Sequence, residues 1–72
     1  MKAELTHVPG VGTHVSADTE QSDELFALFH GDDIECDLVR RGIGGMDVID
    51  FGKDPARLDD IERIFNSWKS RN

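Results

Sequence analysis

The 72-residue sequence predicts an α+β fold in which a small mixed or antiparallel sheet of three to four strands carries two helices on one face. Two β-prone runs, residues 34–41 and 46–51, flank a glycine-rich turn at residues 42–45, and this pattern is typical of a β-hairpin. A long amphipathic stretch follows the hairpin, and a shorter apolar stretch at residues 23–30 precedes it. The expected element order is therefore (β)βαββα.

The alternation of apolar and polar side chains predicts the register of the hairpin. The register pairs Cys36 with Phe51, Leu38 with Ile49, Arg40 with Asp47 and Arg41 with Met46. The first two pairs are apolar and define the buried face, while Arg40 and Asp47 form an ion pair. A shift of one residue would bring Asp50 next to Cys36 on the buried face, so that register is disfavoured.

The other face of the hairpin is a candidate protein-binding surface. It carries Glu35, Asp37, Val39, Met46, Val48 and Asp50. Asp37 lies opposite Asp50, and like charges directly opposed in a sheet are unfavourable unless water or a positive group compensates them. An apolar strip beside these acids, on so small a domain, indicates contact with another protein. We expect the chain to form a homodimer, and we expect this face or the sheet edge to meet a basic protein surface.

The C-terminal stretch predicts an amphipathic helix. Asp54 is its expected N-cap, with Pro55 at the first helical position, where a missing N–H has no cost. Asp59 and Arg63 are spaced to form an i,i+4 ion pair. The apolar stripe contains Leu58, Ile61, Ile64, Phe65 and Trp68. This stripe is expected to pack on the buried face of the hairpin, with Trp68 closing the core at the end of the helix.

The N-terminal segment has weaker signals. Residues 3–8 and 13–17 alternate as two strands around a Pro9-Gly10 turn, which predicts a first hairpin. The alternative is that residues 1–12 are flexible. A hairpin of two strands is marginal by itself, so the sheet needs a third strand, and residues 13–17 are the natural donor.

A helix at residues 23–30 connects the two halves of the chain. Ser22 is its expected N-cap, and Gly31 is expected to end it in a left-handed conformation. A right-handed crossover through this helix would place strand 13–17 parallel to strand 46–51, which then becomes the central strand. The resulting element order is similar in outline to a ferredoxin-like plait without its last strand.

The composition narrows the class of protein. The chain has 15 acidic and 8 basic side chains, a net charge of −7, which argues against direct binding to nucleic-acid phosphates. Residues 21–54 hold nine acids and three bases, whereas residues 55–72 hold three acids and four bases, so the acidity lies on the sheet and its loops. One cysteine excludes an internal disulfide and a CxxC motif. The sequence contains no apolar run of membrane length and no signal-peptide core. We therefore expect residues 1–72 to form a single cytoplasmic domain.

Residues that suggest catalysis or metal binding are few. The acids that could hold a hard cation are Asp32, Asp33, Glu35, Asp37 and Asp50, but their spacing is not that of a calcium loop. Cys36 points toward the core, where a thiol is an inert apolar group. The histidines, which lack metal-ligand spacing, are His7, His14 and His30.

We therefore predict a non-enzymatic protein-interaction module that needs no cofactor and does not bind nucleic acid or membrane directly. Two other classes fit the composition. One is a nucleic-acid mimic that occupies a DNA- or RNA-binding protein, because the net charge is strongly negative. The other is a small metal-dependent enzyme that uses Asp32, Asp33, Glu35 and Asp37.

Overall fold

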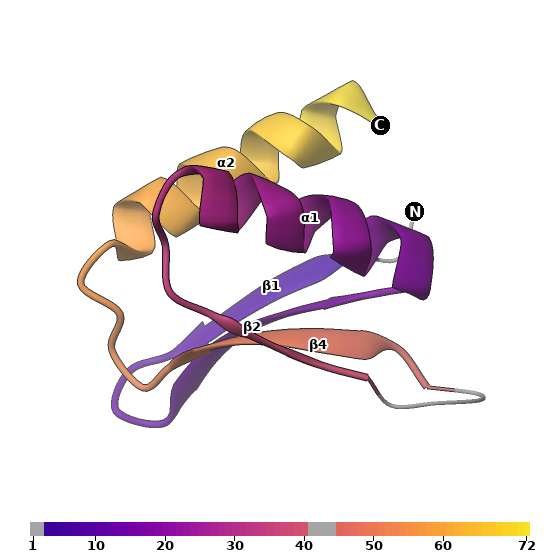
Figure 1. The fold of residues 1–72 in the computed structure, drawn as a ribbon. Coiled ribbons are helices and arrows are strands. Elements are labelled where there is room, and N and C mark those ends of the chain that lie inside the picture. The colour runs from indigo at the N-terminus through magenta and orange to yellow at the C-terminus, as the bar shows by residue number, and fades with distance from the viewer. Residues whose placement is uncertain (1–2, 41–44) are drawn as a thin grey trace.

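A computed structural model describes residues 3–40 and 45–72 of the chain. Its elements in chain order are β1 (Glu4–Val8), β2 (Gly12–Ala17), α1 (Thr19–Gly31), β3 (Asp37–Val39), β4 (Asp47–Gly52) and α2 (Leu58–Arg71). The strands form one open sheet in the order β1-β2-β4-β3, and every neighbouring pair is antiparallel. Both helices lie on the same side of this sheet (Figure 1). The predicted α+β fold and its element order are confirmed.

The register predicted for the second hairpin is correct. The observed pairs are Asp37 with Asp50, Leu38 with Ile49 and Val39 with Val48. Beyond the paired residues, Nη1 of Arg40 lies 2.9 Å from Oδ2 of Asp47, which confirms the predicted ion pair. The predicted turn and the Arg41–Met46 pair include residues 41–44, which lie outside the described ranges.

The predicted parallel pairing of the N-terminal strand is wrong, because β2 pairs with β4 in the antiparallel direction. The chain leaves β2 through α1 and enters β3, which does not neighbour β2 in the sheet. β4 then returns between them, so it is antiparallel to both, while β2 and β3 run in the same direction. The prediction that β4 is a central strand is confirmed, and β1 forms the edge beyond β2.

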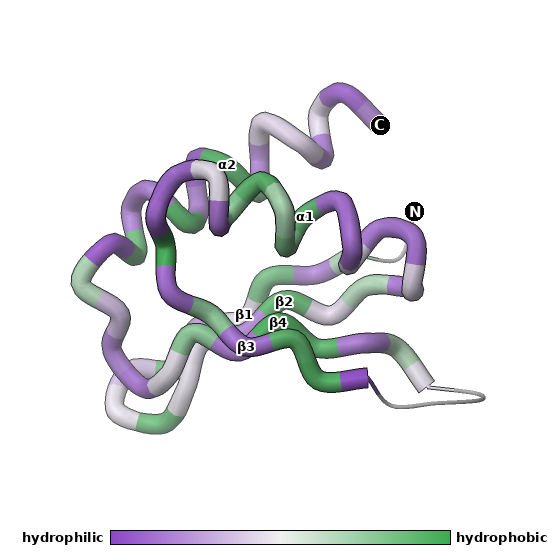
Figure 2. The backbone as a smooth tube through the Cα atoms, viewed as in Figure 1, coloured by the Kyte–Doolittle hydropathy of each residue, from purple (hydrophilic) through white to green (hydrophobic). Residues whose placement is uncertain are grey.

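The core lies between the inner face of the sheet and the two helices. Its buried apolar residues are Ala3, Val15, Ala17, Leu25, Phe29, Ile34, Ile49, Phe51, Ile61, Phe65 and Trp68. The rings of Phe29 and Phe51 meet edge to face with their centroids 4.9 Å apart, a favourable aromatic geometry. Trp68 is 1% exposed and closes the core from α2, as predicted. Hydrophobic and hydrophilic residues are interspersed along the helices and strands, as expected for elements with one buried side (Figure 2).

The first helix begins and ends at residues other than those predicted. Asp18 is the N-cap of α1, and its Oδ1 accepts a hydrogen bond from the backbone N–H of Gln21 at 3.0 Å. Ser22, the predicted cap, lies inside the helix and is fully buried. Gly31 is the last helical residue, and Asp33 takes the left-handed conformation with φ 59°. Both Asp18 and Ser22 are good caps, and the structure uses the earlier residue.

The second helix starts later than predicted. α2 begins at Leu58, and its N-cap position is Arg57, which makes no side-chain capping bond. The predicted cap, Asp54, instead accepts a hydrogen bond through Oδ1 from the backbone N–H of Gly10 at 3.2 Å. This bond connects the loop before α2 to the turn between β1 and β2.

A cluster of ion pairs joins the end of α1 to the start of α2. Nη2 of Arg57 lies 2.7 Å from Oδ2 of Asp32, and its Nε lies 2.9 Å from Oδ2 of Asp60. Nη2 of Arg63 lies 3.3 Å from Oδ1 of Asp60, so Arg63 pairs with Asp60 instead of the predicted Asp59. The hydrogen bonds from Arg57 and then Arg63 hold the pKa of Asp60 below its ordinary value.

A buried carboxylate connects α1 to the sheet. Asp47 is 2% exposed, and its Oδ2 accepts hydrogen bonds from Oγ of Ser22 at 2.8 Å and from Nη1 of Arg40 at 2.9 Å. Arg40 also pairs with Asp23 of α1. A buried carboxylate requires such partners, because its desolvation is otherwise costly. The Asp47 side chain therefore fixes the position of α1 relative to β4.

We predict that Asp47→Ala lowers the free energy of unfolding by about 2 kcal/mol, because it removes the hydrogen bonds that the buried carboxylate accepts from Ser22 and Arg40. Urea unfolding followed by circular dichroism measures the change. Asp59→Ala removes an exposed carboxylate from α2 and serves as the control. Equal unfolding midpoints for the two variants would contradict the prediction.

The Asp60 cluster predicts a dependence of stability on pH. The pKa of Asp60 is lower in the folded chain than its ordinary value of 3.8, so its ionised form stabilises the fold at higher pH. This contribution is lost as the pH falls through the folded pKa. We expect the difference in unfolding free energy between the wild type and Asp60→Asn to be largest near neutral pH and to shrink in acid. Urea titrations at neutral and acidic pH test this, and a difference independent of pH would be inconsistent with it.

Candidate functional site

The side of the sheet that faces away from the helices is the candidate site, and we call it the outer face. Its predicted members are Glu35, Asp37, Val39, Met46, Val48 and Asp50. Their side chains are exposed except for Met46 and Val48, which are half-buried. The strand pairing places Asp37 next to Asp50 and Val39 next to Val48. Glu35 and Met46 lie just before β3 and β4, outside the paired residues.

The pairing of all four strands extends the outer face across the sheet. One row of neighbours runs from Thr6 through His14 and Asp50 to Asp37. The next row runs from Glu4 through Ser16 and Val48 to Val39. His14 therefore lies directly beside Asp50, on the side away from Asp37. The sequence did not place His14 on this face, because that position depends on the antiparallel pairing of β2 with β4.

A shallow cavity of 530 Å³ adjoins the outer face at the start of β3 and the end of β4. Its lining includes His30, Glu35, Cys36, Asp37, Asp50, Phe51 and Gly52. Three of these residues are acids, so the cavity has the electrostatic character that suits a cationic side chain. The carboxylate of Asp50 also has a structural role, because its Oδ1 accepts a hydrogen bond from the backbone N–H of Gly52 at 3.1 Å.

The thiol in this cavity lacks the properties of a nucleophile. Cys36 is half-buried and packs against the core, and its Sγ lies 3.7 Å from the carbonyl oxygen of Ile34. Burial, together with the neighbouring Asp37 carboxylate, raises the pKa of the Cys36 thiol to about 11. The thiolate is the reactive form, so very little of Cys36 is in that form at neutral pH.

The remaining sequence candidates are spread over the molecule. Asp32 belongs to the ion-pair cluster with Arg57, and the neighbouring Asp33 occupies the left-handed position after α1. Nδ1 of His7 lies 2.7 Å from Oγ1 of Thr13, whose side chain is buried. Within residues 3–40 and 45–72, no three or more His, Cys, Asp or Glu residues are placed to hold a metal ion. The acids of the alternative metal site are thus divided between an ion pair, a turn and the outer face.

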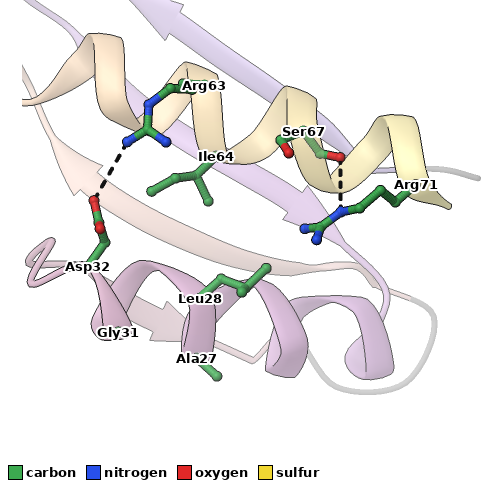
Figure 3. Close-up of a pocket in the computed structure, with 8 residues that line it drawn as sticks. All are labelled: Ala27, Leu28, Gly31, Asp32, Arg63, Ile64, Ser67 and Arg71. Atoms are coloured by element: carbon green, nitrogen blue, oxygen red, sulfur yellow. Dashed lines mark hydrogen bonds and ion pairs between the residues drawn. The ribbon is translucent and has the colours of Figure 1, made fainter.

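A second cavity, of 410 Å³, lies between the two helices (Figure 3). Leu28 and Ile64 contribute apolar side chains, and Nη2 of Arg63 lies 3.9 Å from Oδ2 of Asp32. Nε of Arg71 donates a hydrogen bond to the backbone carbonyl of Ser67 at 3.3 Å. Charges of both signs line this cavity and are bonded within the chain, so it has no concentrated charge comparable to that of the outer face.

Comparisons with protein-family models, curated proteins and solved structures return no match for this chain. In the part of the chain that the structure describes, neither helix has the length and apolar character needed to cross a membrane.

We predict that Cys36 in the folded chain reacts with iodoacetamide at mildly alkaline pH roughly 100-fold more slowly than an ordinary thiol, since a pKa raised from 9.0 to about 11 lowers the thiolate fraction by that factor. Mass spectrometry of timed samples measures the rate. The urea-unfolded chain is the control. Equal rates for the folded and unfolded chains would contradict the prediction.

Proposed function

We propose that this chain is a non-enzymatic protein-interaction module whose outer face binds a basic segment of a partner protein. The observation that carries the proposal is the direct opposition of Asp37 and Asp50, with Glu35 beside the same cavity. Opposed like charges destabilise a sheet, and a lysine or arginine placed between them would remove that repulsion. Binding of a cationic partner is therefore favoured, because it relieves the repulsion between Asp37 and Asp50 that is present in the unbound chain.

The apolar residues beside the acids suit the same kind of partner. Val39 is 50% exposed and neighbours Val48 across the strands, so the outer face has an apolar strip next to its charges. Lysine and arginine side chains have apolar stems that cover such a strip while their charged ends reach the carboxylates. Exposed ion pairs are individually weak and are screened by salt, so the interaction is expected to be moderate and to weaken as ionic strength rises.

The test is a titration of the full chain with a lysine-rich peptide, followed by nuclear magnetic resonance of the backbone amides. We expect the largest shifts on β3 and β4, and about tenfold weaker binding for the double variant Glu35→Lys and Asp37→Lys, because this variant reverses the charge of the site. Asp50 is left unchanged, since its carboxylate bonds to the Gly52 backbone.

The matched control is the double variant Asp59→Lys and Glu62→Lys, which changes the net charge by the same amount at exposed positions of α2. If only overall charge attracted the peptide, both double variants would weaken binding equally. That result, or an affinity insensitive to salt, would refute the proposed role of the outer face.

A further inference from the structure

The open sheet has two edges of different length. Within the described residues, β1 pairs only with β2 and β3 pairs only with β4, so each has one side without a neighbouring strand. β1 contains five residues and β3 contains three. An edge strand presents backbone N–H and C=O groups that a second strand can pair with. The longer edge, β1, offers more of these groups.

The charge distribution distinguishes between the surfaces through which a second copy of the chain could bind. Contact through the outer face or through β3 would bring Asp37 and Asp50 of one copy close to the acids of the other. β1 is separated from β3 by two strands, and Glu4 is its one acidic residue. Of the outer face and the two sheet edges, β1 is therefore the surface at which two chains of charge −7 meet with the least repulsion.

We infer that two copies of the chain pair antiparallel through β1 and form a twofold-symmetric dimer with a continuous sheet. The register that overlaps Glu4–Val8 completely places Thr6 opposite Thr6 of the second copy, on the twofold axis. Glu4 then lies opposite Val8, and Leu5 lies opposite His7. This register opposes no like charges, and a Thr–Thr pair is favourable in a sheet.

The dimer has a defined geometry. Residues directly opposite each other in an antiparallel pair lie on the same face, so the outer-face residues Thr6 of both copies meet on one side. The helices of both copies consequently cover the other side of the joined sheet. The two acidic groups lie at its two ends and remain accessible, so one dimer could bind two basic segments. The dimer does not depend on the proposed function of the outer face.

Charge substitution on the axis tests the dimer. Sedimentation velocity of the wild-type chain is expected to show a monomer–dimer equilibrium. The apparent mass should rise with protein concentration and level off at twice the monomer mass. Thr6→Lys and Thr6→Glu each place like charges across the axis, and each is expected to weaken the dimer by about fivefold or more. An equimolar mixture of the two variants is expected to restore it, because Lys then faces Glu.

The matched control is Ser16→Lys, which adds a charge to the same face but on β2, one strand away from the axis. This variant is expected to dimerise within about twofold of the wild type. A wild-type chain that stays monomeric at every concentration would overturn the inference. A dimer that Thr6→Lys and Thr6→Glu leave intact, or a mixture without rescue, would also overturn it.

A disulfide provides a second measurement. Opposed residues in an antiparallel pair have Cα atoms roughly 4.5 to 5.5 Å apart, which suits a disulfide. Thr6→Cys in a Cys36→Ser background is therefore expected to form a covalent dimer on mild oxidation, whereas Ser16→Cys in the same background is not. Equal cross-linking of the two variants would contradict pairing at β1. Binding of the lysine-rich peptide by the wild-type chain, at a concentration at which the chain is monomeric, shows separately whether the outer face functions.

Discussion

The carboxylate of Asp47 is the polar contact that joins the sheet to α1. It is buried between α1 and β4, and it accepts hydrogen bonds from Ser22 and from Arg40, so one side chain connects three parts of the chain. Apolar contacts are non-directional, and the core alone would permit α1 to rotate or slide on the sheet. A buried carboxylate favours arrangements that keep its hydrogen-bond partners, because burying it without them is costly. The polar contact therefore gives the small core a specific geometry.

The sequence was most informative where the determining contacts are local. Leu38 and Ile49 lie on strands joined by a short connection, and alternation alone assigned them to one face and to one register. Helix ends were less predictable, since Asp18 and Ser22 are equally suitable caps. Ser22 instead bonds to Asp47, which lies 25 residues further along the chain, and Asp18 caps the helix. Asp54 forms its bond with Gly10, 44 residues earlier in the chain, so no local pattern could show that it does not cap α2.

On the outer face, too, contacts within one hairpin were predictable from the sequence, whereas contacts between distant strands were not. The opposition of Asp37 and Asp50 followed from the hairpin register, whereas the place of His14 beside Asp50 required the pairing of β2 with β4. The expected parallel pairing was wrong because α1 leads to β3, a strand of three residues at the far edge, and β4 fills the position between β2 and β3. Strand order is a property of the whole sheet. It separates the acidic end at β3 from the longer edge at β1, and this separation gives the molecule two surfaces of different charge.

The position of Trp68 determines what optical measurements on this protein report. The chain has one tryptophan and no tyrosine, and the indole is buried on the helix side of the sheet. The fluorescence of Trp68 therefore reports whether the core is folded. The sheet separates this fluorophore from the outer face, so the same signal is expected to stay constant when a ligand occupies that surface. Loss of the folded state and occupancy of the outer face can thus be followed independently in one sample, the first by intrinsic fluorescence and the second by a label on the ligand.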